Sequence, residues 1–466
     1  MANRVHFVGI GGIGVSSLAR YFLAQNWPVS GSDIQNSSII QELHTEGVRT
    51  FTTHSKDNLS PDVSLIIHSQ AILPQNPELI EARRLGIPTA TYPEALGALT
   101  NQYKTIAIAG SHGKSTTTAL VANMLIAGGL DPTVIVGTKL REFGNKNFRK
   151  GNGEYLVIEA DEYREAFANY NPDILVITNV DREHLDYYLN FQNVQKAFIN
   201  FTNNLKVGGT VIANSEDPGL NLIKAQLPKE TIWFGLQSRP HIKLVANLEN
   251  ILNIHGRFNL SNALAAALAA QTLNIDDSII LKAAAGYRGA WRRMEYKGDL
   301  KVAGNKVKVF DDYAHHPTEI KATLGALREQ FPKSQLICVF QPHQLHRLKV
   351  LFDDFKESFS KVDNLILLDA YQVKGRDEVN DVSHNIDSNK LAKAISKLKK
   401  RPDVVYLPNR NDLNGVLLNA IESSKNKSAV VVMMGAGDIV DMTPRLLEYR
   451  GTTKNFKRSL TPSKRK

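Results

Sequence analysis

The sequence predicts an α/β protein of three domains in which the sheets are mostly parallel. Short apolar runs of strand length alternate with segments of helical periodicity over most of the chain, as in parallel sheets whose strands are connected by helices. At 466 residues the chain is also too long for one ordinary domain. Two glycine-rich turns each join an apolar run to a helical segment, which fits this architecture.

The alternation divides the chain into three predicted domains and a tail. The first domain, residues 1–102, has predicted strands at Val5–Val8, Val29–Gly31 and Val63–Ile67. The second, residues 103–294, has strands at Lys104–Ala109, Tyr155–Ile158 and Ile174–Thr178 and an Ala-rich helix at Leu260–Thr272. The third, residues 295–450, has strands at Lys306–Phe310, Leu336–Phe340, Leu365–Leu368 and Val430–Met434. Residues 451–466 form a basic tail that we expect to be disordered.

The net charge of +10 is concentrated in that tail. Residues 451–466 contain six Lys and Arg and no acid, which leaves only +4 for the other 450 residues. The body of the protein is therefore only mildly basic, and we expect no nucleic-acid partner.

Cysteine content and hydropathy indicate the compartment. Cys338 is the only cysteine and lies in an apolar run, so an inert buried thiol is the favoured interpretation. No stretch approaches the ~20 apolar residues of a membrane span, and a strand-like run from Val5 takes the place of a signal peptide. We expect a cytoplasmic protein.

The first glycine-rich turn, Gly9-Ile10-Gly11-Gly12-Ile13-Gly14, follows a predicted strand and precedes a helix at Val15–Gln25. Glycines in this pattern let backbone N–H groups at a helix N-terminus approach a pyrophosphate. Asp33 lies at the end of the next strand, where an acid that binds ribose is found. The motif leaves NAD, FAD and UDP-sugars open, and a turn needed only for strand–helix packing is the alternative.

The second turn, Gly110-Ser111-His112-Gly113-Lys114-Ser115-Thr116, also follows a strand and opens a helix. A lysine beside backbone donors neutralises phosphate charge, and the next hydroxyl can bind Mg²⁺. Ile108 stands where the general P-loop pattern has another glycine, so this is a contracted variant. A helix cap with a surface lysine is the alternative. Two such turns in one chain suggest an enzyme that uses ATP on a second phosphorylated molecule.

Several longer motifs follow in order along the chain. They are GIGGIG, GSHGKSTTT, EADE at Glu159–Glu162, NVDREHLDYY at Asn179–Tyr188, FNLSNALAA at Phe258–Ala266, WRRMEYKG at Trp291–Gly298, DDYAHHPTE at Asp311–Glu319, FQPH at Phe340–His343 and GAGD at Gly435–Asp438. In this order they resemble the Mur ligase family, and within it the branch that adds L-alanine to UDP-N-acetylmuramate. The resemblance covers residues 4 to about 449.

The resemblance implies an N-terminal Rossmann-like domain that binds the UDP substrate, a central P-loop ATPase-like domain and a C-terminal Rossmann-like domain. It also implies ATP and Mg²⁺, an acyl-phosphate intermediate, and a monomer or weak homodimer. The implied catalytic residues are Lys114, Glu159, His184, Arg293, His316 and Arg347. The implied metal ligands are Ser115, Glu159 and His184.

The remaining implied residues are those that contact substrates. ATP is expected at Gly110, Ser111, His112, Gly113, Lys114, Ser115, Thr116, Asn259, Asn262, Arg293 and Asp312. The UDP substrate is expected at Gly9, Gly11, Gly12, Gly14, Asp33 and Ser69. The amino acid is expected at His315, His316, His343 and Arg347.

Each of these residue types also has an ordinary structural interpretation. Glu159 fits a strand-end surface acid and His184 a structural histidine. Asn259 fits a helix cap with Asn262 on the surface, and the Arg292–Arg293 pair fits a solvated basic pair beside a linker.

The chain departs from the family pattern at several points, and the stretch between Asp217 and Asn259 is also short for the family. Phe258 stands where members of the branch often have His, and Gln344 where many have Arg. Other branches carry a carbamylated lysine at a position that aligns with Phe198, and Lys196 is two residues away, so we expect no carbamylation.

Three rival functions remain at this stage. A ligase that attaches a preformed peptide to UDP-N-acetylmuramate shares several of the motifs. An NAD-dependent oxidoreductase would use the first turn and Asp33 but leaves the Lys114 turn unexplained. A nucleic-acid-binding ATPase would use the basic tail.

Overall fold

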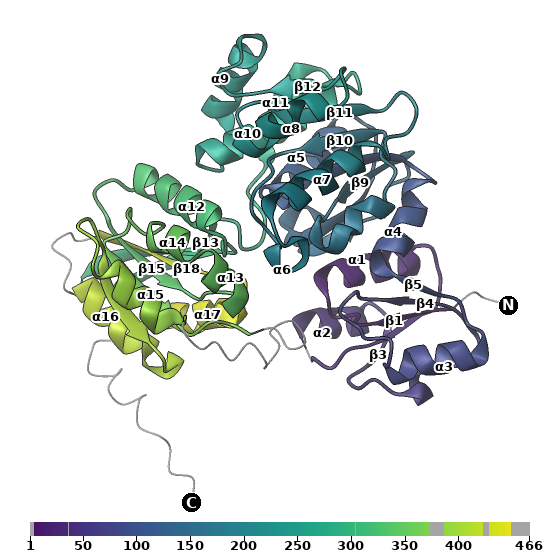
Figure 1. Cartoon of the computed structure of the whole chain (residues 1–466), viewed down its shortest axis with the longest axis horizontal. Coiled ribbons are helices and arrows are strands. Elements are labelled where there is room, and N and C mark those ends of the chain that lie inside the picture. Colours follow the sequence, from purple (N-terminus) through teal and green to yellow (C-terminus); the bar gives the residue numbers. More distant parts are fainter. Residues whose placement is uncertain (1–3, 36, 303, 373–385, 423–427, 449–466) are drawn as a thin grey trace, which may run out of the picture. The chain divides into compact units, whose positions relative to one another are not determined.

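The computed structural model describes residues 4–35, 37–302, 304–372, 386–422 and 428–448. These residues form two compact units (Figure 1). The first contains the chain up to Ile254 together with Phe258–Ala290, and the second contains the chain from Trp291 onward together with His255–Arg257. The second unit thus begins a few residues before the predicted start of the third domain at residue 295. The basic tail lies outside the described residues.

The N-terminal part of the first unit is a parallel five-stranded sheet of order β3-β2-β1-β4-β5. Its elements are β1 (Arg4–Val8), α1 (Ile13–Ala24), β2 (Val29–Ser32), α2 (Ser38–Thr45), β3 (Arg49–Phe51), η1 (Lys56–Asn58), β4 (Val63–His68), α3 (Pro77–Leu85), β5 (Thr89–Thr91) and α4 (Tyr92–Thr100). The order reverses at β1, whose neighbours β2 and β4 lie on opposite sides, so the turn after β1 lies at the switch point where such sheets bind ligands.

The central part of the first unit is a seven-stranded sheet of order β12-β11-β10-β6-β9-β7-β8, parallel except for β8. Its elements are β6 (Lys104–Ala109), α5 (Lys114–Ala127), β7 (Thr133–Leu140), η2 (Arg141–Phe143), β8 (Lys146–Arg149), β9 (Tyr155–Glu159), η3 (Tyr163–Asn169), β10 (Ile174–Ile177), α6 (Leu185–Tyr188), α7 (Phe191–Thr202), β11 (Thr210–Asn214), α8 (Pro218–Ile223), η4 (Lys224–Gln226), β12 (Ile232–Phe234), η5 (Arg239–His241), α9 (Ile242–Ile251), α10 (Arg257–Gln271) and α11 (Asp277–Gly286). β6 lies between β10 and β9, so the second glycine-rich turn follows the strand at the middle of this sheet.

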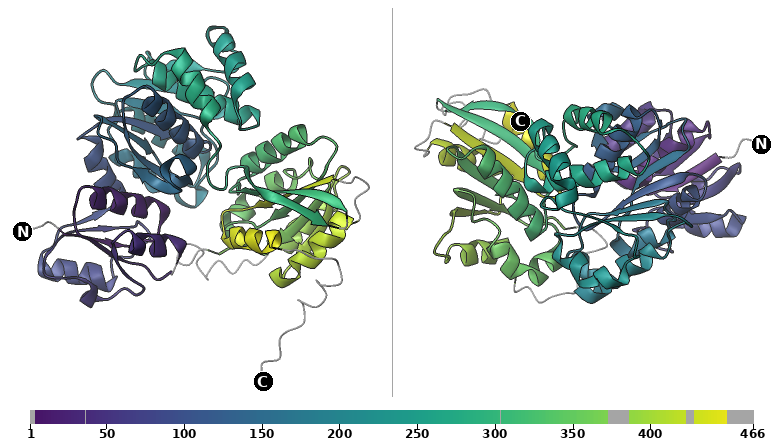
Figure 2. Two further views of the ribbon diagram at one scale, coloured as in Figure 1. Left: turned by 180° about the vertical axis from the view of Figure 1, so that it is seen from behind. Right: turned by 90° about the horizontal axis from the view of Figure 1, so that it is seen from above.

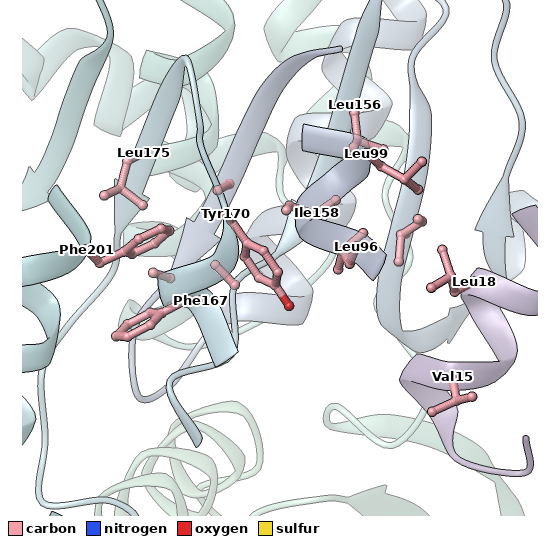
Figure 3. Close-up of a cluster of buried hydrophobic side chains, with 14 of the residues drawn as sticks. Val15, Leu18, Leu96, Leu99, Leu156, Ile158, Phe167, Tyr170, Leu175 and Phe201 are labelled. Atoms are coloured by element: carbon pink, nitrogen blue, oxygen red, sulfur yellow. The ribbon is translucent and has the colours of Figure 1, made fainter. Parts of the chain in front are cut away.

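One hydrophobic core continues from the first sheet into the central sheet (Figure 3). It joins Leu18 of α1 and Leu96 of α4 to Ile158 of β9 and Phe201 of α7. Gly97 lets α4 approach η3, because a Cβ there would lie 2.3 Å from the carbonyl oxygen of Asn169. The two sheets therefore pack as parts of one unit.

The second unit is a six-stranded sheet of order β13-β14-β18-β15-β16-β17, parallel except for β13. Its elements are β13 (Glu295–Val302), β14 (Asn305–Asp312), α12 (Pro317–Gln330), β15 (Gln335–Phe340), α13 (Leu345–Val350), α14 (Phe352–Lys356), β16 (Asn364–Leu368), α15 (Ser388–Ile395), β17 (Asp403–Leu407), η6 (Arg410–Asp412), α16 (Leu413–Glu422), β18 (Ser428–Met434), η7 (Asp438–Asp441) and α17 (Met442–Leu447). Helices α12 and α15 pack on one face and α16 and α17 on the other (Figure 2).

The predicted α/β class with mostly parallel sheets is confirmed. Every strand named from the sequence is present to within two residues at either end. The predicted strand Ile174–Thr178 ends one residue earlier, at Ile177, and the Thr178 hydroxyl donates to the carbonyl of His112 in the neighbouring turn. Cys338 is buried in the core of the second unit, and burial raises the pKa of its thiol, as expected for an inert cysteine.

Candidate active site

The first glycine-rich turn leads from β1 into α1 and is held by residues from the neighbouring strands. Gly9 has φ +80°, and a Cβ there would lie 3.1 Å from Ser69, whose N–H donates to the carbonyl of Val8. The N–H of Gly11 donates to Oδ2 of Asp33 at 2.9 Å. Asp33 therefore shapes the turn itself, a role that the sequence did not assign to it.

The start of α1 has the character of an anion site. No described side chain caps its N-terminus, and its first turn carries no acid. Gly14 lies inside this turn, where a Cβ would come within 3.0 Å of the ring of Tyr92. The N–H groups of the first turn, together with the helix dipole, can receive a phosphate.

The second glycine-rich turn leads from β6 into α5, and its two glycines leave no room for side chains. Gly110 has φ +133° and lies against Thr178, and Gly113 has φ +83° and lies against Asn262. Ser115 and Thr116 are buried in the first turn of α5. The turn and the helix start thus have the geometry of a phosphate-binding loop despite the missing glycine at Ile108.

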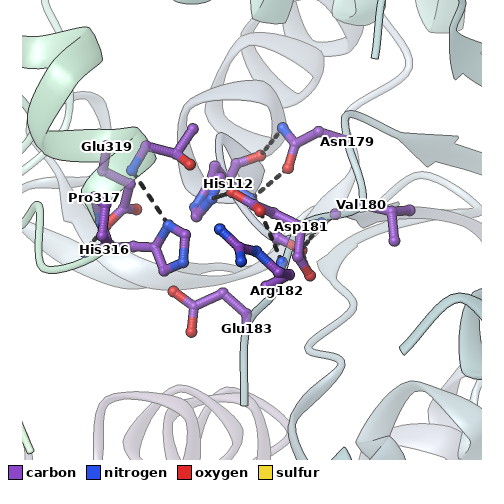
Figure 4. A network of polar contacts seen from close by, with 12 residues as sticks. His112, Asn179, Val180, Asp181, Arg182, Glu183, His316, Pro317 and Glu319 are labelled. Carbon is purple, nitrogen blue, oxygen red and sulfur yellow. Dashed lines mark hydrogen bonds and ion pairs between the residues drawn. The ribbon is translucent and has the colours of Figure 1, made fainter. Parts of the chain in front are cut away.

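The segment after β10 holds this turn in shape (Figure 4). The side chain of Asn179 accepts from the N–H of His112 at 2.8 Å and donates to its carbonyl at 2.9 Å. Nε2 of His112 lies 2.9 Å from Oδ2 of Asp181. The sequence did not single out Asn179 or Asp181, although both belong to the NVDREHLDYY motif.

Lys114 is folded back onto its own turn. Its Nζ donates to the carbonyl of Gly110 at 2.7 Å and to Oε2 of Glu162 at 2.8 Å. Burial opposes the charged form, but the surrounding carboxylates, Glu162 foremost, outweigh it and raise the pKa of Lys114. The lysine is therefore charged, and it is not the surface lysine of the alternative interpretation.

A cluster of two acids and a histidine lies beside Lys114. Ligand atoms of Asp161, Glu162 and His184 all lie within 4.8 Å of one another. Oε1 of Glu162 is buried, makes no hydrogen bond within the described part of the chain, and lies 3.7 Å from Nε2 of His184. Burial raises the pKa of Glu162, which the charge of Lys114 opposes. Such a set of carboxylate and imidazole donors fits a divalent cation.

Of the three expected metal ligands, His184 belongs to this cluster, and Glu159 acts on Lys114 beside it. His184 begins α6 with φ +54°, and its ring lies 4.8 Å from the ring of Tyr163. Glu159 ends β9 with its carboxylate facing Gly137 of β7, where a Cβ would lie 2.5 Å from Oε2. Glu159 also acts electrostatically on Lys114, so it is not a solvated strand-end acid.

The two asparagines of α10 are both buried. Asn259 and Asn262 are each 6% exposed, and their side chains lie 3.5 Å apart. The interpretation that places Asn262 on the surface is therefore wrong, because α10 packs against the turn at Gly113. Phe258, which precedes Asn259, is half-buried.

In the second unit, the segment before β13 folds onto the ends of β14 and β18. The N–H of Met294 donates to Oδ2 of Asp312 at 2.7 Å, and burial raises the pKa of Asp312 to about 6. Arg293 lies 5.0 Å above the ring of Tyr313 and 3.7 Å from Glu319.

The burial of Arg292 shows that the interpretation of Arg292–Arg293 as a solvated basic pair is wrong for Arg292. Its side chain is 5% exposed and donates to the carbonyls of Gly435 and Gly437 after β18. These two hydrogen bonds connect the segment from Trp291 to the second unit, which explains why that unit begins before residue 295.

The ends of β14 and β15 bring together three of the four residues expected to bind the amino acid. The rings of His315 and His343 lie 5.8 Å apart, and Nη1 of Arg347 donates to the carbonyl of His343 at 3.2 Å. His316 instead caps α12: its Nδ1 accepts from the N–H of Thr318 at 3.3 Å. Gln344 has φ +67° and is the N-cap of α13, the helix that carries Arg347.

Comparison with known proteins agrees with this arrangement over almost the whole chain. Residues 4–104 match the model described as Mur ligase family, catalytic domain; residues 108–270 match the Mur ligase middle domain; and residues 292–437 match the Mur ligase, glutamate ligase domain. The chain belongs to the Mur ligase family.

Mur ligases from several bacteria are similar to it over nearly their full length. The UDP-N-acetylmuramate–L-alanine ligase of Syntrophus aciditrophicus (strain SB) is 36% identical over 463 residues, covering 96% of this chain and 93% of the relative. The ligase of the same name from Aquifex aeolicus (strain VF5) is 35% identical, covering 94% and 95%.

Solved Mur ligase structures share the fold. The UDP-N-acetylmuramate-alanine ligase MurC of Thermotoga maritima has a TM-score of 0.76 and 25% identity, covering 98% of this chain and 99% of that one. The murein peptide ligase mpl of Psychrobacter arcticus 273-4 has a TM-score of 0.67 and 22% identity, covering 96% and 98%, and shows the fold alone. Among the described residues, no helix is both long enough and apolar enough to cross a membrane.

Proposed function

We propose that this chain joins L-alanine to the lactyl carboxylate of UDP-N-acetylmuramate and releases ADP and phosphate. The observation that carries the proposal is the similarity, 35–36% identity over nearly the full length, to ligases named for this reaction. The two phosphate-binding turns support it, because the reaction uses two molecules with phosphate chains and each turn lies at the middle of its own sheet.

The reaction has two chemical steps. The carboxylate oxygen attacks the γ-phosphorus of ATP and ADP leaves, which gives an acyl phosphate. The amine of L-alanine then attacks the acyl carbon, and the tetrahedral intermediate expels phosphate. Negative charge on the phosphoryl oxygens dominates the first barrier, so fixed cations lower it most effectively.

We assign the residues of the first unit to the phosphates. Lys114 is held charged at the turn before α5, and we assign it to the β- and γ-phosphates. The start of α1 receives the diphosphate of the UDP substrate. Asn259 and Asn262, buried beside Gly113, fit the adenine side of the ATP site.

Mg²⁺ belongs to this proposal. Ser115, Glu159 and His184 would hold it, with Asp161 and Glu162 beside them, and when bound the ion offsets charge on the phosphoryl oxygens. In the second unit we assign Arg293 and Asp312 to ATP, and His315, His316, His343 and Arg347 to the amino acid and the acyl phosphate. The substrates, ATP and a UDP-sugar, also indicate a cytoplasmic enzyme.

A phosphate-release assay with ATP, Mg²⁺ and UDP-N-acetylmuramate tests the proposal. We expect release that depends on L-alanine. Glycine and L-serine, assayed in its place, measure how strictly the enzyme selects the amino acid. Release with the tripeptide L-alanyl-γ-D-glutamyl-meso-diaminopimelate and none with L-alanine would replace the proposal by a peptide ligase of cell-wall recycling.

A further inference from the structure

The hairpin of β7 and β8 in the central sheet lies against helix α1 of the first sheet, within the same compact unit. α1 begins at the glycine-rich turn assigned to the UDP substrate. The hairpin contributes one fully buried polar side chain to this contact, Asn147 of β8.

Asn147 donates both of its amide hydrogens to the first turn of α1. Its Nδ2 lies 2.5 Å from the carbonyl oxygen of Ile13 and 3.0 Å from Oγ of Ser16. Ile13 is itself part of the turn Gly9–Gly14. A side chain of the central sheet is thus bonded to the backbone of the turn in the first sheet.

The orientation of Asn147 is fixed from its other side. Nη1 of Arg20 donates to its Oδ1 at 2.5 Å, so the amide nitrogen must face the turn. Arg20 is only 3% exposed and is paired with Glu42 at 3.1 Å and with Glu46 at 2.8 Å.

Two lysines of the same hairpin complete this network. Lys139 of β7 pairs with Glu42 at 2.5 Å, and Lys146 of β8 pairs with Glu46 at 3.2 Å. The acids that hold Arg20 are therefore themselves held by the hairpin. Three cations thus share two carboxylates around the buried side chains of Arg20 and Asn147, and such a network has little freedom to rearrange.

We propose that Asn147 is a positioning residue for the UDP substrate: it fixes the first turn of α1 so that its N–H groups are aligned for the diphosphate. This inference rests on the proposed function of the first glycine-rich turn. It makes the affinity of the first domain for its substrate depend on a residue of the ATP-binding domain. Alignment of backbone donors before binding raises affinity, because the ligand does not have to order them.

Asn147→Asp tests the proposal with little change of volume. The carboxylate keeps the bond from Arg20 and cannot donate to Ile13 or Ser16. We expect the Kd for UDP-N-acetylmuramate, measured by calorimetry, to rise about tenfold or more, the equivalent of one or two buried hydrogen bonds. We expect the Kd for ADP and the kcat at saturating substrate to change less than about threefold.

Lys150→Ala is the matched control. Lys150 also joins this hairpin region to α1, but its Nζ donates at 2.8 Å to the carbonyl of Ala24, at the end of the helix away from the turn. We expect no change in the Kd for UDP-N-acetylmuramate. Equal increases in Kd for the two variants would overturn the proposal, since any weakening of the interface would then suffice.

Thermal unfolding separates a positioning role from a purely structural one. A lower Tm for Asn147→Asp with an unchanged Kd for UDP-N-acetylmuramate contradicts the proposal. If Asn147→Asp does not fold, Ser16→Ala decides: it removes one of the two acceptors, and we expect the same Kd to rise about threefold. Wild-type protein that binds no UDP-N-acetylmuramate would instead contradict the proposed function, so the two failures are distinguishable.

Discussion

Nζ of Lys114 lies 2.8 Å from Oε2 of Glu162, and the other oxygen of that carboxylate faces His184. A buried ion pair thus links the phosphate-binding turn to the donor cluster expected to hold Mg²⁺. Removal of either partner leaves the other charge buried and uncompensated, which is costly. The pair therefore helps to fix the position of the turn relative to the cluster.

Lys114→Ala should abolish turnover, with a loss of about 10³-fold or more, because the charge on the phosphoryl oxygens loses its fixed cation. The Kd for UDP-N-acetylmuramate should stay nearly unchanged, since that substrate is assigned to the turn after β1. Phosphate release and calorimetry measure the two effects. Lys104→Ala, an exposed lysine of β6 paired with Glu154, is the control. A comparable loss of affinity for UDP-N-acetylmuramate would contradict the assignment of the two turns.

Glu162→Gln should raise the Mg²⁺ concentration needed for half-maximal activity by about 10–100-fold, because a carboxylate beside the expected ligands becomes neutral. A magnesium titration of phosphate release measures this. Glu154→Gln, an exposed acid at the start of β9, should leave the titration unchanged. An unaltered magnesium requirement for Glu162→Gln would exclude this carboxylate from the metal site.

Gly113→Ala should prevent ATP binding, because a Cβ would lie 2.4 Å from Oδ1 of Asn262 and φ is +83°. Gly129→Ala is a matched control: its φ is +79° but nothing lies within 4 Å of the added Cβ. Both variants should lose about 1 kcal/mol of stability from backbone strain. Only Gly113→Ala should lose ATP affinity in calorimetry. Retained affinity would show that α10 shifts to make room for the added Cβ.

Glu165→Gly should stabilise the protein by less than about 1 kcal/mol, because relief of the positive φ of 54° at Glu165 is partly offset by the chain entropy that glycine loses on folding. Urea unfolding gives the difference in free energy. Glu142→Gly, at an exposed site of η2 without positive φ, should destabilise the protein slightly. A loss of stability in Glu165→Gly would show that the Glu165 side chain outweighs its backbone strain.

The carboxyl group of Asp311 should make the free energy of unfolding fall as the pH rises from about 4 to 6. Burial raises its pKa to about 6, against the hydrogen bond from Thr443, while the unfolded carboxyl titrates near 3.8. In this window the native protein binds a proton that the unfolded chain has released, so the free energy of unfolding falls by about 3 kcal/mol.

Asp311→Asn should remove this part of the pH dependence, as measured by urea unfolding at each pH. Asp353→Asn, at a side chain that is 89% exposed, should leave it in place. The same slope in Asp311→Asn as in the wild type would assign the effect to another group.

Much of the fold and part of the site could be predicted from local sequence patterns. Apolar runs mark the strands, and Lys114 and Gly113 belong to a motif whose residues are adjacent in the chain. The motifs after β14, β15 and β18 meet because parallel strands end at one edge of a sheet.

Contacts between residues far apart in the chain correspond to no local sequence pattern. Arg292 resembles a surface arginine in the sequence, yet it is buried against carbonyls more than 140 residues away. Asn147 belongs to no recognisable motif, and only the packing of β8 on α1 gives it partners. Asn179 belongs to the motif NVDREHLDYY, but nothing in the sequence indicates that His112 is its partner.

The position of β18 determines when the second unit can fold during synthesis. β18 is the last strand among the described residues, yet it lies between β14 and β15 and pairs with both. Until residues 428–434 have left the ribosome, β14 and β15 lack the strand that joins them. The sheet β3-β2-β1-β4-β5 needs only residues up to Thr91 and can form far earlier. The N-terminal sheet can therefore fold during translation, and the C-terminal unit completes its core only after residues 428–434 have been synthesised.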